Sequence, residues 1–114
     1  MPIQYEDTSA NIRLIKISGR LDIPGTGEIE GKFAALAATD THPVVVDLTE
    51  VSFLGSIGIR VLVSNAKAQL QRGGKMVLFV GDNAVVTKTL KMTGIDSLVP
   101  MFVDMGEATG AVAA

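Results

Sequence analysis

The sequence predicts an α/β fold in which a mixed, largely parallel sheet of about five strands packs against about four helices. Apolar runs such as Val44-Val45-Val46 indicate strands that are too buried to alternate with polar residues. Between these runs lie longer segments whose apolar residues recur at three- and four-residue spacing, as in helices. Because parallel strands need crossover connections, such intervening helices indicate parallel neighbours.

The N-terminal third predicts two strands and a helix. A first strand precedes residues 11–18, where apolar and basic side chains alternate as in a half-exposed strand near a sheet edge. Gly19 is expected to end this second strand. A turn marked by Pro24, Gly25 and Gly27 then leads into a helix expected from about Glu28 to Ala38.

The central third predicts a strand at residues 43–48 and a helix from Ile57 to Gln71. Gly73-Gly74 is expected to end this helix, because glycine reaches the left-handed conformation of a helix C-terminus at little cost.

The next segment, Lys75–Val80, reads as another buried strand. Asn83 is expected to cap a helix that runs to about Thr93, and Gly94 is expected to end it.

A last short strand is expected from Leu98 to Val103, provided that Pro100 lies where its missing amide hydrogen faces an edge or a bulge. The tail from Asp104 is either a short terminal helix or partly frayed. The predicted order is strand, strand, helix, strand, helix, strand, helix, strand, helix.

Composition narrows the classes of function. A chain of 114 residues has the length of one domain, so residues 1–114 are expected to form a single domain. The absence of cysteine excludes disulfides, cysteine nucleophiles and thiolate metal sites. His42 is the only histidine, so neither a metal site nor a histidine-based triad is expected, and no cofactor is predicted.

Charge and hydropathy argue against two kinds of partner. Ten basic and twelve acidic residues give a net charge of −2 without a basic cluster, so nucleic-acid binding is not expected. No apolar run reaches the ~18 residues that cross a bilayer, and the N-terminus lacks a basic flank before an apolar core. We therefore expect a cytoplasmic protein that does not insert into membranes.

Ser56 is the candidate functional residue, because it lies where a buried strand passes into a helix. The first amides of a helix lack partners and its dipole is positive there, so both a capping hydroxyl and a phosphate are favoured. Ser56 is therefore expected either to cap the helix or to be a modification site. Ile59 stands where Glu or Gln would complete a capping box.

Three segments carry a resemblance across nearly the whole chain: Ile15–Asp22, Val46–Ile59, and Leu90–Asp96 with Phe102. In these segments the chain resembles the STAS domain and, within that family, the single-domain anti-sigma factor antagonists. The resemblance implies the same α/β architecture. It also implies a partner-switching role, in which an anti-sigma factor/serine kinase binds the unmodified protein, phosphorylates it and thereby releases it, and a serine phosphatase reverses the modification.

The family's central motif usually reads acid, Ser, Ser or Thr, Gly, aliphatic, and its first hydroxyl is the one phosphorylated. Ser56 falls on that position. Gly55 replaces the acid and Ile57 replaces the second hydroxyl, whereas Gly58 and Ile59 match. The resemblance implies a partner-binding surface formed by Asp22, Gly55, Ser56, Ile57, Gly58 and Arg60.

Three further alternatives remain at this level, one of which is a small-molecule sensor with a pocket beneath the loop, although the sequence offers no specific polar cluster for it. Asp22 either contributes to the partner surface or hydrogen-bonds its own turn. The altered motif also allows a constitutive scaffold or transporter-associated subunit, in which Ser56 is only a helix cap.

An enzyme is not expected, because no nucleophile has a base nearby in the sequence and the glycines fit neither the phosphate-loop nor the dinucleotide pattern.

Overall fold

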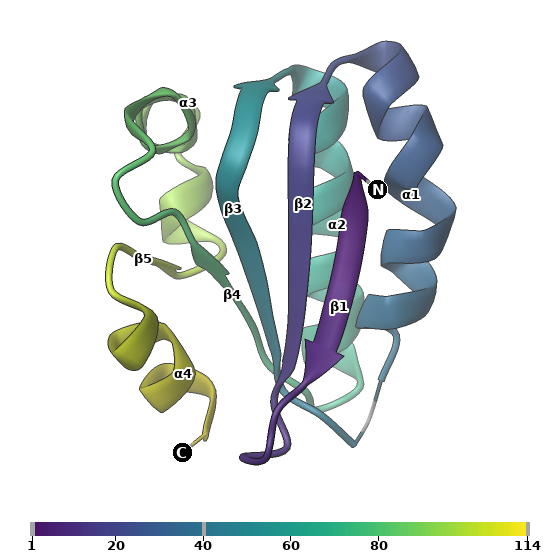
Figure 1. Ribbon diagram of the computed structural model, residues 1–114, viewed down its shortest axis with the longest axis vertical. Helices are drawn as coiled ribbons and strands as arrows, with labels where there is room; N and C mark the ends of the chain where they lie inside the picture. The colour runs from purple at the N-terminus through teal and green to yellow at the C-terminus, as the bar shows by residue number, and fades with distance from the viewer. Residues whose placement is uncertain (1, 40, 114) are drawn as a thin grey trace.

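The computed structural model describes residues 2–39 and 41–113. It contains a five-stranded sheet in the order β1-β2-β3-β4-β5 (Figure 1). The strands are β1 (Ile3–Asp7), β2 (Arg13–Leu21), β3 (Val44–Leu54), β4 (Met76–Phe79) and β5 (Met101–Phe102). The first pair is antiparallel and the other three pairs are parallel, which confirms the predicted mixed, largely parallel sheet.

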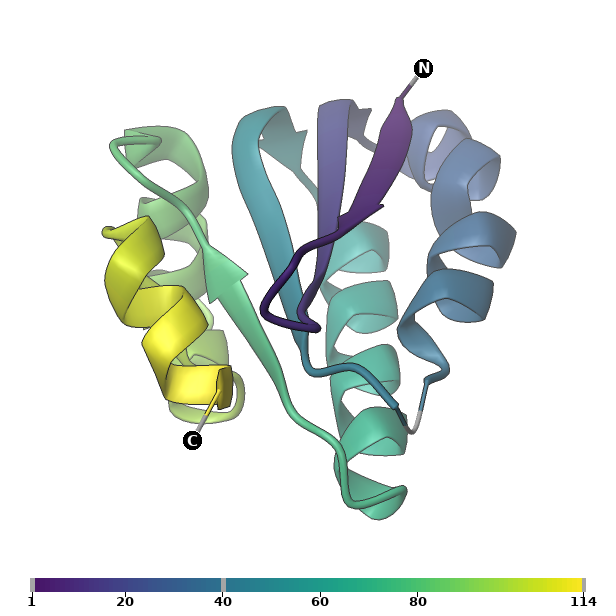
Figure 2. The same cartoon turned by 60° about the horizontal axis from the view of Figure 1, so that its bottom comes forward.

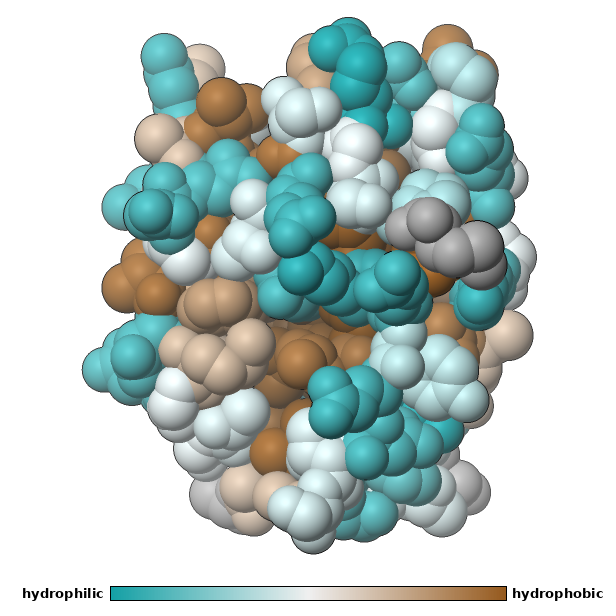
Figure 3. All heavy atoms as spheres, in the orientation of Figure 1, coloured by the Kyte–Doolittle hydropathy of each residue, from teal (hydrophilic) through white to brown (hydrophobic). Residues whose placement is uncertain are grey.

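Helices cover the two faces of the sheet unequally (Figure 2). The larger core lies on the face covered by α1 (Ile23–Ala37) and α2 (Ser56–Gln71), and it includes residues of α3 (Ala84–Met92) and of the 3₁₀ turn η1 (Ile95–Ser97). The smaller core lies on the other face beneath α4 (Met105–Ala113). In Figure 3, hydrophobic atoms gather over α4 and the adjoining part of the sheet, whereas hydrophilic atoms cross the middle of this face.

The helix α1 begins earlier than predicted, at Ile23 instead of Glu28. Its N-cap is Asp22, whose carboxylate accepts a hydrogen bond from the Gly25 amide at 2.9 Å. Pro24 lies in the first turn, where a missing amide hydrogen removes no intrahelical bond. Proline and glycine here therefore belong to the start of the helix and not to a preceding turn.

Two strand boundaries also differ from the prediction. Gly19 does not end β2, which continues to Leu21 through register shifts against β3 on both sides of residues 18–19. The strand β3 extends to Leu54 instead of ending at residue 48. Its second half was missed because exposed or half-exposed side chains such as Thr49 and Glu50 interrupt the apolar pattern.

The predicted helix boundaries at Asn83, Gly73 and Gly94 in the second half of the chain are confirmed. The Asn83 side chain accepts from the Val86 amide at 3.2 Å and caps α3. Gly73 and Gly94 have φ angles of 81° and 75°, the left-handed conformation expected after a helix. The tail forms α4, with Asp104 accepting a hydrogen bond from the Glu107 amide.

The last strand is shorter than predicted, covering Met101–Phe102 instead of residues 98–103. Part of the preceding segment forms η1, and Pro100 is exposed directly before the strand. Because proline has no amide hydrogen, it cannot donate to β4 and the ladder does not continue past it.

Candidate functional site

Two strand-to-helix junctions meet at the carboxyl ends of β2 and β3. The Gly55 amide, between β3 and α2, donates a hydrogen bond to the Leu21 carbonyl oxygen at 3.0 Å. A Cβ atom at Gly58 would lie 2.9 Å from the Leu21 Cβ and 3.0 Å from the Leu54 Cδ1. The start of α2 therefore lies against the β2–α1 junction at a distance that only glycine allows.

Ser56 is the first residue of α2, and the N-cap is Gly55, with extended φ and ψ of −86° and 174°. The Gly55 carbonyl already accepts the first helical bond, from the Ile59 amide at 3.0 Å. The expectation that Ser56 caps the helix is therefore wrong, because a capping side chain must come from the residue before the first helical turn. The Ser56 side chain is exposed, and its hydroxyl makes no hydrogen bond with any described residue.

Asp22 makes the turn contact that was one of its two predicted roles. Besides the Gly25 amide, its carboxylate contacts the Arg20 guanidinium, with the Arg20 Nε and the Asp22 Oδ2 3.3 Å apart. The amide hydrogen bond from Gly25, followed by the Arg20 contact, lowers the pKa of Asp22 below its ordinary value. Its contribution to a partner surface stays a prediction.

A stacked pair that was not predicted from the sequence lies beside this junction. The Arg20 guanidinium lies over the Phe53 ring, 4.6 Å from its centroid. The two residues are register partners on β2 and β3. Because irregular pairing precedes this point, no local sequence signal reveals that they meet.

The predicted site residues divide by exposure. Asp22, Gly55, Ser56 and Ile57 are exposed or half-exposed around the junction, whereas Gly58 is buried and serves packing. Arg60 is exposed on α2 one turn beyond Ser56, on the same side of the helix. Exposed Ile23 adds an apolar side chain at the start of α1.

The electrostatics of this surface favour an anion at Ser56. The helix start supplies unpartnered amides and a positive dipole end, and Arg60 follows at a spacing that places side chains side by side. The carboxylate of Asp22 is already engaged by Gly25 and Arg20. A phosphate on Ser56 would consequently meet positive groups of its own chain.

Two kinds of structural feature are absent from the part of the chain that the structure describes. Residues 2–39 and 41–113 contain no group of three His, Asp or Glu side chains that could hold a metal ion. None of the helices described is long and apolar enough to cross a membrane.

Comparison with known proteins identifies relatives along most of the chain. Residues 6–108 match the model of the STAS domain. The chain is 24% identical over 103 residues to the anti-sigma-F factor antagonist RsfB of Mycobacterium tuberculosis, covering 89% of this chain and 81% of the relative. It is 29% identical over 84 residues to an anti-sigma-B factor antagonist of Staphylococcus epidermidis, covering 74% and 77%.

Solved structures share the fold. An anti-sigma factor antagonist from Mycobacterium paratuberculosis superposes with a TM-score of 0.86 at 23% identity, over 98% of this chain and 93% of that one. The Bacillus cell fate determinant SpoIIAA in its phosphorylated form superposes with a TM-score of 0.67 at 17% identity, over 96% and 98%.

Proposed function

The chain belongs to the STAS domain family, and from that premise we propose that it is a cytoplasmic anti-sigma factor antagonist of a partner-switching system. It binds an anti-sigma factor/serine kinase while Ser56 is unmodified. Phosphorylation of Ser56 releases it, and a serine phosphatase restores binding. The names of its relatives and the exposed Ser56 support this proposal.

The exposed Ser56 hydroxyl carries the proposal. It stands at the start of α2 without an internal hydrogen bond, so a kinase can reach it without breaking a contact of the fold. Exposed Ile23 and Phe53 and half-exposed Ile57, at the two strand-to-helix junctions, add apolar area that a partner can bury. SpoIIAA, which shares the fold, has been solved in a phosphorylated form.

Phosphorylation at the centre of such an interface has a large energetic effect. A phosphate adds a charge of about −1.5 to −2. The start of α2 and Arg60 face this charge in the free chain, but a partner surface that fits the neutral hydroxyl excludes water from it and offers no cation in return. Burying a charge in this way costs on the order of 3–5 kcal/mol. At about 1.4 kcal/mol per decade, binding weakens roughly a hundredfold to a few thousandfold.

Mass spectrometry of the full chain, incubated with the cognate kinase and ATP, tests the acceptor. We expect one phosphate on Ser56, none on the Ser56→Ala variant, and normal phosphorylation of Ser52→Ala, which removes another exposed hydroxyl just before the junction. Label on Ser52 or Ser64 with Ser56 unmodified would contradict the assignment.

Calorimetric titration against the partner tests the switch. Ser56→Glu should weaken binding by less than phosphate does, because a carboxylate carries one charge and fewer acceptors. Ser56→Ala should keep both the affinity and the urea midpoint of unfolding, because the Ser56 hydroxyl caps nothing.

A constitutive scaffold or transporter-associated subunit is the second candidate, and the altered motif favours it. Gly55 and Ile57 stand where the family usually has an acid and a second hydroxyl. Equal affinities of wild type, Ser56→Ala and Ser56→Glu for the true partner would support this candidate and contradict the switch.

A further inference from the structure

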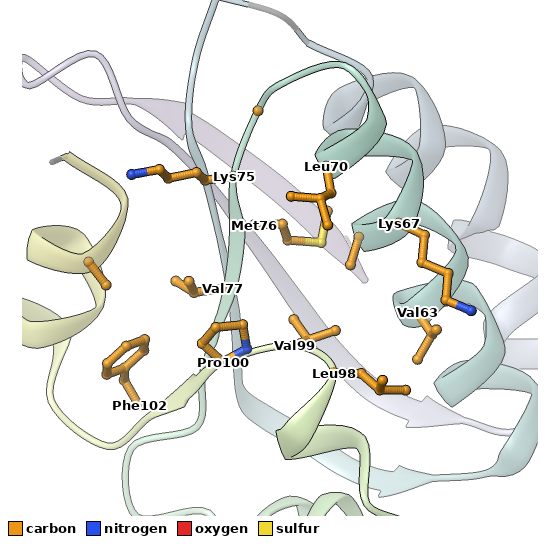
Figure 4. A pocket seen from close by; sticks show the side chains of 13 residues that line it. Val63, Lys67, Leu70, Lys75, Met76, Val77, Leu98, Val99, Pro100 and Phe102 are labelled. Atoms are coloured by element: carbon orange, nitrogen blue, oxygen red, sulfur yellow. The ribbon is translucent and has the colours of Figure 1, made fainter.

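A cavity of about 460 Å³, whose lining does not include Ser56, opens at the edge of the sheet between α2 and α4 (Figure 4). Met76 and Val77 of β4 lie along its floor, with labelled side chains of α2 on one side. Ala111 of α4 also lines it. The segment Leu98–Pro100 borders it where the chain approaches β5. This volume lies within the range of small-molecule sites, about 300–1,000 Å³.

The cavity exists because β5 covers only part of the edge of β4. The two strands pair at Leu78 with Met101 and at Phe79 with Phe102. The Pro100 carbonyl accepts a hydrogen bond from the Leu78 amide at 2.8 Å, but Pro100 has no amide hydrogen to donate in return. The ladder stops there, and the edge of β4 before Leu78 faces the space between the two helices.

Apolar side chains line this space and stay exposed at its mouth. Leu70 and Leu98 are 72% and 62% exposed, although both border the cavity. Large apolar side chains exposed together around a hollow are a feature of ligand-binding grooves and interaction surfaces. An aliphatic chain laid in the cavity would cover both leucines.

Among the described residues that line the cavity, the two charged side chains are lysines. Its thirteen lining residues include Lys67 and Lys75 and no Asp or Glu. Figure 4 shows Lys67 extending along the α2 side and Lys75 directed toward α4. Lys67 makes no salt bridge with any residue among 2–39 and 41–113. An anionic head beside an aliphatic chain would complement this arrangement, whereas a cationic head would be repelled.

We propose that this cavity binds a single-chain alkyl carboxylate, with its chain over Met76 and Val77 and its carboxylate beside Lys67. The site is independent of Ser56 and of the proposed switch. Because each buried methylene contributes about 0.8 kcal/mol, affinity should rise about fourfold for each methylene added until the cavity is filled.

The test is calorimetric titration of the full chain with octanoate, decanoate and dodecanoate below their micelle concentrations. We expect saturable binding that tightens with chain length and a decanoate affinity at least tenfold above that of decyltrimethylammonium. Lys67→Gln should remove most of this preference, while Lys88→Gln, an exposed lysine of α3 outside the cavity, should keep it.

Variants that fill the cavity provide a second test of the proposed site. Ala111→Phe adds a ring at an exposed position of α4 and should weaken decanoate binding at least tenfold, whereas Ala35→Phe, at an exposed position of α1, should not. The circular dichroism spectrum and melting temperature show whether each variant is folded. If Ala111→Phe does not fold, Leu98→Glu, which places a carboxylate at the mouth, should give the same loss.

Three results would overturn the proposal. The first is no saturable binding of any of the three carboxylates. The second is decanoate binding that neither Ala111→Phe nor Leu98→Glu weakens. The third is a dimer in sedimentation velocity that Ala111→Phe dissociates, since a second copy of the chain would then cover the cavity.

Discussion

At the scale of the residue, Asp22 and Ser56 occupy similar positions in the chain but have different roles in the fold. Both stand where a strand passes into a helix, and both residue types are good N-caps. Asp22 caps α1, whereas Ser56 lies one residue inside α2 and its hydroxyl stays free among the described residues. The hydroxyl is available for chemistry because Gly55 occupies the capping position.

The depressed pKa of Asp22 makes its contribution dependent on pH. Its pKa is lowered in the folded state, first by the Gly25 amide hydrogen bond and then by Arg20. The stabilisation is complete above the unfolded value of about 3.9 and is lost as the pH falls through the lower folded pKa. Asp22→Asn should therefore lower the urea midpoint at pH 7 and leave a smaller difference from wild type near pH 3.

Urea titrations of both proteins at pH 7, 5, 4 and 3 measure this difference. Glu28→Gln, on the exposed face of α1, is the matched control and should follow wild type throughout. A midpoint difference for Asp22→Asn that stayed constant from pH 7 to pH 3 would mean that the carboxylate charge contributes nothing there.

At the scale of the element, two glycines of α1 differ in their surroundings: Gly25 lies against another part of the chain, whereas Gly27 does not. A Cβ atom at Gly25 would collide with the Arg20 carbonyl oxygen, while one at Gly27 would meet nothing within 4 Å. Gly25→Ala should destabilise the fold by about 1–3 kcal/mol through overpacking. Gly27→Ala should stabilise it by about 0.5–1 kcal/mol, because alanine is the better helix former. Thermal and urea unfolding of both variants compare these effects; equal shifts in one direction would refute the assignment of Gly25 to a close contact.

Helix boundaries could be predicted from the sequence where local residues alone determine them. Asn83, Gly73 and Gly94 end or begin helices through local geometry, and their roles were predicted correctly. The start of α1 was not predicted correctly. In the sequence Gly25 resembles a turn residue, and only the structure shows that it lies against the Arg20 carbonyl oxygen.

In the candidate site, too, local features were predicted from the sequence and tertiary contacts were not. The position of Ser56 at a strand-to-helix junction was predicted from adjacent residues. The contacts across the junction were not, since Arg20 and Phe53 meet only through register shifts between β2 and β3, and these depend on tertiary pairing.

At the scale of the whole molecule, the two candidate sites lie at separate ends of one rigid element. Ser56 begins α2, and Lys67 lies eleven residues along it, about 16 Å away at 1.5 Å per residue. The start of α2 is held by the Gly55 hydrogen bond to Leu21 and by the tight contacts of Gly58. A phosphate on exposed Ser56 breaks none of these contacts, so the proposed switch acts by changing surface charge and needs no refolding.

Amide chemical shifts of the phosphorylated and unphosphorylated chain test this rigidity. We expect changes confined to residues 20–25 and 52–60, with β4, β5 and α4 unaffected, and decanoate affinity equal in both forms. The control is Ser56→Glu, whose smaller charge should perturb the same amides less. Shift changes that reach α4, or a phosphorylated chain with altered decanoate affinity, would show that the two ends of α2 are coupled and that the charge acts through a conformational change.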